Sequence, residues 1–204
     1  MLSGQKIVLA VTGSIAAYKS CELLRLLIKR GTEVSVIMTE AAQRFVTPLS
    51  FQALGAKKVY TGDWGDSASP IPHIEATKDA SLLLVAPATA NILAKAAQGL
   101  ADDLLSAAIL AARCPVAYAP AMNTFMWHNQ ATQRNVTQLT QDGAIFLGPD
   151  SGEQACGDIG SGRMLEPEDI IELLQGAFSP RLLDRCRVLI TAGPTYEPID
   201  PVRG

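Results

Sequence analysis

The sequence predicts an α/β fold, with an open and mostly parallel sheet that carries helices on both faces. Three observations support this prediction. Short apolar runs rich in β-branched residues recur along the 204-residue chain, segments with helical periodicity separate them, and 48% of the residues are hydrophobic against 18% charged. Strands that alternate with helices are typical of parallel sheets, because each parallel connection needs a crossover, and this much apolar sequence can bury one large core.

The first strand–helix–strand unit opens the chain. Residues 7–11 form a short apolar run, typical of a buried strand, and a turn of small residues follows at 12–14. From Ala16 the apolar positions recur at helical spacing, and Gly31 is expected to cap this helix. Residues 34–38 then form the second strand, which completes one βαβ unit.

The same alternation continues through the rest of the chain. Further strands are expected at 82–86, 116–119 and 144–147, and further helices at 89–98, 104–112, 130–141 and 167–174. Two segments interrupt it, residues 61–72 and 148–163, which are rich in glycine and proline and show little periodicity. We predict loops there, and loops of this length inside a compact domain are usually functional or mobile.

The last residues start a new element. Residues 188–191 read as a strand and residues 192–195 as a tight turn, but a strand and a turn cannot form a domain by themselves. We therefore expect one domain over residues 1–180, and in residues 181–204 a linker and the beginning of a second domain.

Charge and composition disfavour several classes of protein. With 17 basic and 20 acidic residues the chain has a formal net charge of −3, whereas a protein that coats nucleic acid needs a basic field. The most apolar stretch, 82–97, is interrupted by polar residues and proline, and the N-terminus does not read as a signal peptide. The four cysteines are widely separated, so metal and disulfide sites are disfavoured and a cytoplasmic location is expected.

Small and polar residues follow several of the predicted strands. In an open α/β sheet, ligands bind beyond the carboxyl ends of the strands, where these residues would lie together. They are Gly13, Ser14, Ile15, Thr39, Thr89, Ala90, Asn91, Ala121, Met122 and Asn123. The first turn matches neither GxGxxG nor the P-loop pattern, so it is either a phosphate site at a helix start or a plain turn with Ser14 as N-cap.

Three further residues are candidates for chemistry. The amide of Asn123 offers donors to a carboxylate or a flavin edge, although the neighbouring methionines and Trp127 could equally be packing. His73 could carry a proton, or it could be an unremarkable loop histidine; His128 we interpret as structural, at a helix start. Cys156 lies in the glycine-rich segment, which could form a flap that closes over a substrate.

Taken in order, five motifs resemble those of the flavin-dependent cysteine decarboxylases. They are GSIAAYK from Gly13, His73, PATAN from Pro87, PxMNxxMW ending at Trp127, and ACGDxGxGRM from Ala155 to Met164. The resemblance covers about residues 5–175, and its last two motifs are highly specific. The terminal VLITAGPTYEPIDPVR resembles the start of a phosphopantothenate–cysteine ligase domain, but no ligase activity is expected from this chain.

The resemblance implies a Rossmann-like, flavodoxin-like flavoprotein that decarboxylates 4'-phosphopantothenoylcysteine to 4'-phosphopantetheine in coenzyme A biosynthesis. It implies FMN as cofactor, with its phosphate at Gly13, Ser14 and Ile15 and further contacts from Thr39, Thr89, Ala90, Asn91 and Ala121. It also implies a homo-oligomer, trimer-based and often dodecameric, with FMN and substrate between subunits. The implied route oxidises the cysteine moiety to a thioaldehyde, releases CO₂ to give an enethiol, and then reduces that enethiol.

Roles follow for individual residues by the same resemblance. His73 would act in oxidation and decarboxylation, Asn123 beside Met122 would hold the departing carboxylate, and Cys156 would protonate the product. Arg163 is placed near the substrate phosphate on its charge alone.

Four other activities are weighed against this one. A peptidyl-cysteine oxidative decarboxylase is disfavoured by Cys156 in its full motif, and a non-catalytic flavin-binding regulatory subunit by the presence of His73. A flavin prenyltransferase is disfavoured by His73 together with PxMN. A nicotinamide oxidoreductase is disfavoured by the missing GxGxxG.

Overall fold

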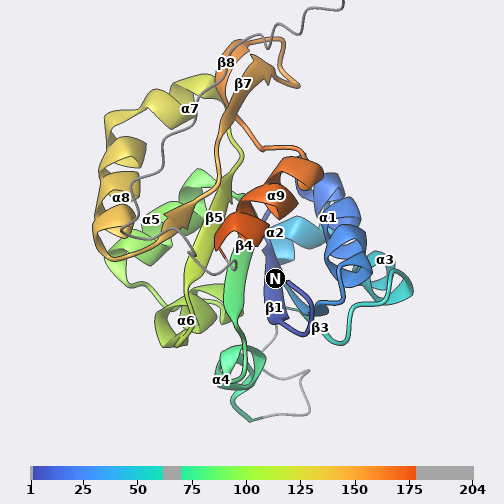
Figure 1. Cartoon of the computed structure of the whole chain (residues 1–204). Helices are drawn as coiled ribbons and strands as arrows, with labels where there is room; N and C mark the ends of the chain where they lie inside the picture. Colours follow the sequence, from blue (N-terminus) through green and yellow to red (C-terminus); the bar gives the residue numbers. More distant parts are fainter. Residues whose placement is uncertain (1, 62–69, 178–204) are drawn as a thin grey trace, which may run out of the picture.

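A computed structural model describes residues 2–61 and 70–177 of the chain (Figure 1). Its centre is a six-stranded sheet in the order β3-β2-β1-β4-β5-β6, and every neighbouring pair is parallel. The strands are β1 Lys6–Val11, β2 Glu33–Met38, β3 Val59–Thr61, β4 Leu82–Ala88, β5 Val116–Pro120 and β6 Ile145–Phe146. The predicted fold class is confirmed.

The strand order places a topological switch between β1 and β4. The chain proceeds from β1 through β2 to β3 on one side, and from β4 through β5 to β6 on the other. Ile7 is paired with Val34 of β2 and with Leu82 of β4, so β1 lies between the two halves. In open α/β sheets the crevice at such a switch, beyond the carboxyl ends of the strands, is where ligands bind.

Two apolar clusters cover the two faces of the sheet, because side chains alternate along each strand. Helices α1 Ala17–Lys29 and α9 Pro167–Ala177 pack on the face that carries Ile7 and Leu9. Helices α5 Ala90–Gln98 and α6 Leu104–Ala111 pack with Leu139 on the face that carries Val8. Figure 1 shows these helices as separate layers.

The remaining helices are short, apart from α8 Gln130–Gln141. They are α2 Glu40–Gln43, α3 Pro48–Ala53, α4 Pro72–Thr77 and α7 Thr124–His128. None of these short helices, nor the edge strand β3, was predicted, because four to six residues are too few to display a period. His128 ends α7 rather than starting a helix, so that prediction is wrong.

The glycine-rich segment is the main difference from the predicted pattern. Where the sequence predicts a loop over residues 148–163, the structure has an antiparallel hairpin of β7 Asp150–Glu153 and β8 Ile159–Arg163. The Ser151 and Ser161 hydroxyls face each other across it at 2.8 Å. Such strands contain almost no apolar residues, so alternation could not reveal them.

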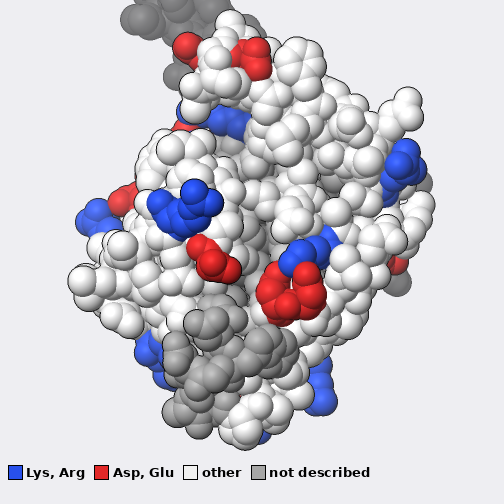
Figure 2. Space-filling view, turned by 180° about the vertical axis from the view of Figure 1, so that it is seen from behind, with Lys and Arg blue, Asp and Glu red and all other residues white. Residues whose placement is uncertain are grey.

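The second predicted loop, over residues 61–72, is also only partly correct. Thr61 ends β3 and Pro72 starts α4, and residues 62–69 lie outside the described part of the chain. The predicted strand and turn at 188–195 also lie outside it. Among the helices of residues 2–61 and 70–177, none has the length and apolar character that crossing a bilayer requires. On the face shown in Figure 2, basic and acidic side chains are interspersed among uncharged ones.

Candidate functional site

The turns that follow four neighbouring strands meet at one edge of the sheet. The Thr39 amide, after β2, donates to the Val11 carbonyl at the end of β1 (3.1 Å). At the end of β4, the Ala88 carbonyl accepts from the Ala121 amide, which follows β5 (3.0 Å). The hydroxyl of Thr12 lies 3.3 Å from that of Thr89, which joins the two halves of the sheet. The structure thus brings the predicted cofactor residues of these turns to a single edge.

The turn after β1 is compact and has no side-chain cap of the expected kind. The N-cap of α1 is Ala16, whose methyl group cannot accept a hydrogen bond, and the Ser14 hydroxyl instead accepts from the Ala16 amide at 3.2 Å. The alternative of Ser14 as N-cap is therefore wrong. A Cβ at Gly13 would lie 2.5 Å from that of Ala41, so only glycine allows α2 to approach this closely.

The donors on this edge suit an anionic group. The amide of Ile15 makes no hydrogen bond to the residues that the structure describes, and it directly precedes Ala16, the N-cap of α1. Free amides at such a position, together with the Ser14 hydroxyl, are a usual phosphate cradle. The Thr39 hydroxyl caps α2 by accepting from the Ala42 amide (3.2 Å), and Asn91 is exposed in the first turn of α5.

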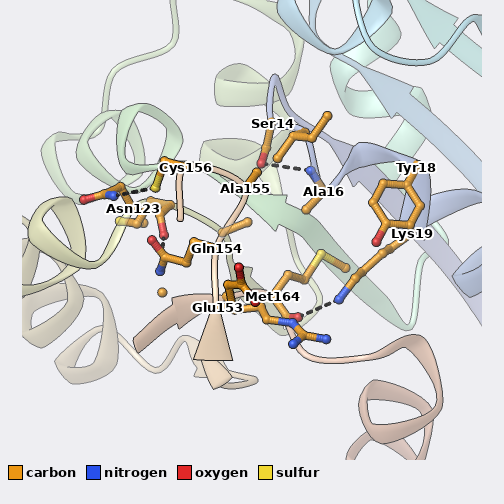
Figure 3. Close-up of a pocket in the computed structure, with 15 residues that line it drawn as sticks. Ser14, Ala16, Tyr18, Lys19, Asn123, Glu153, Gln154, Ala155, Cys156 and Met164 are labelled. Carbon is orange, nitrogen blue, oxygen red and sulfur yellow. Dashed lines mark hydrogen bonds between the residues drawn. The ribbon is translucent and has the colours of Figure 1, made fainter. Parts of the chain in front are cut away.

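A pocket of about 440 Å³ opens beside this edge (Figure 3). Its walls come from the β1–α1 turn, the start of α1, the segment after β5 and the hairpin. It is lined by Ser14, Ile15, Ala16, Tyr18, Lys19, Ala121, Met122, Asn123, Glu153, Gln154, Ala155, Cys156, Gly162, Arg163 and Met164. This volume falls in the range of small-molecule sites.

The hairpin is fastened to the segment after β5 by close backbone contacts. The Met122 amide donates to the Gly162 carbonyl (2.9 Å), and the Thr124 amide donates to the Gln154 side chain (3.0 Å). A Cβ at Gly160 would lie 2.5 Å from the Thr124 hydroxyl, and one at Gly162 would strike the Met122 carbonyl. These two glycines therefore allow close packing of the hairpin on residues 122–124.

At the tip of the hairpin, Asn123, Cys156 and Asp158 form a cluster. The Asn123 Nδ2 lies 2.6 Å from Asp158 Oδ2 and 3.2 Å from Cys156 Sγ, and the Cys156 thiol donates to the same Asp158 oxygen at 3.2 Å. Figure 3 shows Asn123 and Cys156 pointing toward each other. The Asn123 amide and the Cys156 thiol, by donating to it, hold the pKa of the Asp158 carboxyl below its ordinary value.

The orientation of Asn123 follows from its place at a helix start. Its Oδ1 accepts from the Phe125 amide (2.9 Å) and so caps α7. Because that contact requires the oxygen, the NH₂ group must face the hairpin, with both of its hydrogens toward Cys156 and Asp158. The motif around Asn123 thus fixes a two-donor group at the rim of the pocket.

Two cations line the opposite side of the pocket and share one carboxylate. Lys19, only 6% exposed, donates to the Met164 carbonyl (3.0 Å) and to Glu166 (2.9 Å), and Arg163 pairs with the same Glu166. Lys19 keeps the pKa of Glu166 below its usual range, against the effect of burial and with help from Arg163. The positive charge of Arg163 is therefore already partly balanced.

His73 does not join this site within one chain. It lies in the first turn of α4 and is half buried, and its carbonyl accepts from the Thr77 hydroxyl at 3.1 Å. Figure 1 shows α4 at one end of the sheet and the hairpin with α7 at the other. The description of His73 as a loop histidine is wrong, since Pro72 starts a helix there.

Residue-level analysis of the sequence missed three members of the site. Asp158, Gln154 and Lys19 each contact the pocket or its frame through side-chain hydrogen bonds. Asp158 and Lys19 stand inside motifs that had been singled out, ACGDxGxGRM and GSIAAYK, so their positions in these motifs were the available signal. Gln154 lies just before the first of these motifs and carried no comparable signal.

Comparison with known proteins places this geometry in a family. Residues 1–179 match the flavoprotein family, and residues 183–204 match the C-terminal domain of DNA/pantothenate metabolism flavoproteins. The chain is 50% identical over 203 residues to the coenzyme A biosynthesis bifunctional protein CoaBC of Vibrio cholerae, covering 99% of this chain and 51% of that protein. It is 48% identical over 207 residues to the CoaBC of Bacillus subtilis, with 100% and 51% covered. The chain thus spans about half the length of the curated relatives it matches.

Solved structures agree with this assignment. A Cys-to-Ser mutant of PPC decarboxylase, complexed with pantothenoylaminoethenethiol, is 33% identical with a TM-score of 0.76, over 85% of this chain and 98% of that one. The FMN binding protein AtHal3 is 34% identical with a TM-score of 0.74, over 85% and 96%. On these grounds, the chain belongs to the flavoprotein family.

Proposed function

We propose that this protein binds FMN and decarboxylates 4'-phosphopantothenoylcysteine to 4'-phosphopantetheine, a step of coenzyme A biosynthesis. The observation that carries the proposal is the contact of Asn123 with Cys156 in a pocket at the carboxyl edge of the sheet. An amide that can hold a carboxylate there faces a thiol that can supply a proton. The names of the CoaBC relatives and of PPC decarboxylase point to the same pathway and reaction.

FMN fits the residues at this edge. The free Ile15 amide and the Ser14 hydroxyl would hold its phosphate. Thr39, Thr89, Ala90, Asn91 and Ala121 follow the strands on the two sides of the switch between β1 and β4, and two of them, Ala90 and Ala121, are small enough to leave room for a flat ring. When bound, FMN supplies the reversible two-electron oxidation that lets the carboxyl group leave from a carbon next to an electron-withdrawing C=S group.

Asn123 is assigned the task of holding the carboxylate that is lost. Its uncharged amide stays a donor at every physiological pH, and the cap on α7 fixes where its hydrogens point. Met122, half buried beside it, would pack against the substrate chain. Arg163 would attract the substrate phosphate with the charge that Glu166 leaves available.

Cys156 is assigned the proton that completes the product. Its thiol is exposed, at the tip of the hairpin, and it lies against the group proposed to bind the departing carboxylate. Proton delivery requires a donor within about 3 Å of the reacting atom, a reach that this position allows.

His73 is assigned the proton transfer that accompanies substrate oxidation, and this assignment requires a second copy of the chain. Since α4 lies at the other end of the sheet, one chain alone would not bring His73 to Asn123 and Cys156. We therefore propose a homo-oligomer with each site shared between copies, and its assembly from trimers into a dodecamer is what the family resemblance implies. Large apolar side chains of the pocket lining, Ile15 and Tyr18, and of the neighbouring α7 and β8, Phe125 and Ile159, are exposed and suit such contacts.

The proposal also covers the domain boundaries and the location of the protein in the cell. Residues 1–180 would form the decarboxylase domain, and residues 181–204 would begin a ligase domain, as their family match suggests. We place the protein in the cytoplasm, where cysteines stay reduced and Cys156 keeps its thiol.

Reaction of the FMN-loaded protein with phosphopantothenoylcysteine tests the function directly. We expect CO₂ and 4'-phosphopantetheine in equal amounts. The first is measured as released gas and the second by mass spectrometry. Release of CO₂ with only the oxidised enethiol would favour an oxidative decarboxylase instead. Absence of CO₂ from protein that binds FMN would refute the proposed activity.

A further inference from the structure

Asp158 holds the amide that the substrate is proposed to use. The Asn123 NH₂ group has two hydrogens, and one points to the Asp158 carboxylate at 2.6 Å while the other points to Cys156 at 3.2 Å. The Oδ1 of the same side chain is committed to the cap of α7. Within the described residues, then, every hydrogen-bonding position of the Asn123 side chain except the second oxygen lone pair is filled.

A substrate carboxylate on Asn123 must therefore replace one of the two present partners. Asp158 is an anion, and two carboxylates on one amide nitrogen would repel each other at short range. Cys156 brings no second carboxylate to the amide and can remain. We propose that Asp158 occupies, in the free protein, the position of the substrate's carboxylate, and that substrate binding displaces it; this inference rests on the proposed function.

The surrounding structure allows the Asp158 side chain to leave without moving the hairpin. The Asp158 carbonyl accepts from the Gln154 amide (2.8 Å), and the Gly157 amide donates to the Gln154 carbonyl (2.8 Å), so the turn is held by its backbone. The base of the hairpin is fastened separately, through Gly162 to Met122. Asp158 is half exposed, so rotation about its side-chain bonds carries the carboxylate into solvent.

Displacement makes the site respond to whether the ligand has a carboxylate. A ligand that brings one must break the contacts of Asp158 with Asn123 and Cys156, whereas a ligand without one leaves them intact. Once CO₂ has left, Asp158 can return to Asn123, and the product no longer competes for it. Asp158 is thus a positioning residue that weakens substrate binding selectively over product binding.

A matched pair of ligands tests this inference by calorimetry on the FMN-loaded full chain. The first is 4'-phosphopantothenoylserine, which carries the carboxylate but no oxidisable thiol, and the second is 4'-phosphopantothenoylethanolamine, which lacks the carboxylate. For Asp158→Asn and Asp158→Ala we expect the serine ligand to bind about tenfold tighter, the scale of one charge-assisted hydrogen bond, and the ethanolamine ligand to change less than about twofold.

Glu153→Gln is the control, because Glu153 lines the same pocket and has no hydrogen bond to Asn123 among the contacts described. It removes one negative charge without freeing the amide, so both ligands should respond alike and by less than about twofold. Equal tightening of both ligands in the Asp158 variants, or unchanged or weaker binding of the serine ligand, would overturn the inference. A wrong function would show itself separately, as no CO₂ from phosphopantothenoylcysteine with the wild-type chain.

Discussion

The two ends of the sheet differ in how much of the candidate chemistry each one assembles. At the carboxyl end, Asn123, Cys156 and Asp158 lie within hydrogen-bond distance of one another, and a fastened hairpin holds them there. At the other end, His73 stands on a helix of six residues, apart from those groups. One chain thus builds the part that is proposed to hold a carboxylate and deliver a proton, while the histidine would serve a neighbouring copy.

Replacing His73 should have the largest effect on the reaction rate. His73→Asn keeps a similar shape but removes the proton carrier, so we expect flavin reduction by substrate to slow by a factor of about 10² or more. Stopped-flow bleaching of the flavin at saturating substrate measures it directly. FMN content and CD melting should stay as in the wild type, and an unchanged bleaching rate would contradict the assigned role.

Mixing two inactive variants tests whether the two ends of the sheet in different copies form one active site. If each site takes His73 from one copy and Asn123 from another, hetero-oligomers of His73→Asn with Asn123→Ala should regain activity. Random assembly restores roughly a quarter of the sites, because each site draws two independent copies. Recovery after denaturing and refolding the mixture, against separately refolded controls, measures this. No recovery from mixed oligomers would mean that each chain completes its own site.

The thiol at the carboxyl end should affect only the second half of the reaction. Cys156→Ser keeps a hydrogen-bonding group near Asn123 but replaces the thiol by a hydroxyl, a far weaker acid, so CO₂ should still be released while the enethiol accumulates. We expect formation of 4'-phosphopantetheine to fall by about 10²-fold, the usual contribution of a general acid. Mass spectrometry of the quenched reaction separates the two products. A full yield of 4'-phosphopantetheine would refute the role of Cys156.

Most of the sheet could be predicted from the sequence, because its signals are local. Buried parallel strands such as 82–86 are continuous apolar runs, and the helix predicted at 130–141 has the bounds of α8. The hairpin could not be predicted, since β7 and β8 are polar and glycine-rich and are held by contacts with residues 122–124, far away in the sequence. Tertiary contacts of this kind leave no hydrophobic periodicity in the sequence.

The candidate site was predictable as a set of residues rather than as a geometry. The motif residues Asn123 and Cys156 were singled out, and the structure brings them to 3.2 Å. Asp158 was not, although it stands two positions after Cys156, because a carboxylate in a polar loop is usually solvated. That His73 would lie apart from them could not be predicted either, since distance across a sheet depends on topology.

Two glycines of the hairpin offer a matched test of what holds it against residues 122–124. At Gly162 φ is +131° and a Cβ would strike the Met122 carbonyl, whereas at Gly157 φ is +89° and nothing lies within 4 Å. We expect Gly162→Ala to lower the free energy of unfolding by about 2–3 kcal/mol and Gly157→Ala by about 1 kcal/mol, the cost of the backbone conformation alone. Urea unfolding measures both. Equal losses would mean that packing on Met122 adds nothing.

The smallest expected effect is on the pH dependence of stability, through the ion pair of Lys19 with Glu166 beside the pocket. The pKa of Glu166 lies below its ordinary value of 4.5, chiefly because Lys19 donates to it. A carboxyl whose pKa falls on folding stabilises the fold above its unfolded pKa, and this contribution disappears as the pH drops through the folded pKa. Glu166→Gln should therefore be less stable than wild type near pH 7, by about 0.5 kcal/mol given its exposure, and the difference should shrink below about pH 4. Glu172→Gln, a change at an exposed residue in the middle of α9 with no ion pair among the described contacts, is the control. Urea midpoints at pH 7 and pH 3.5 compare the two variants, and a Glu166→Gln difference that grows on acidification would contradict the assigned ion pair.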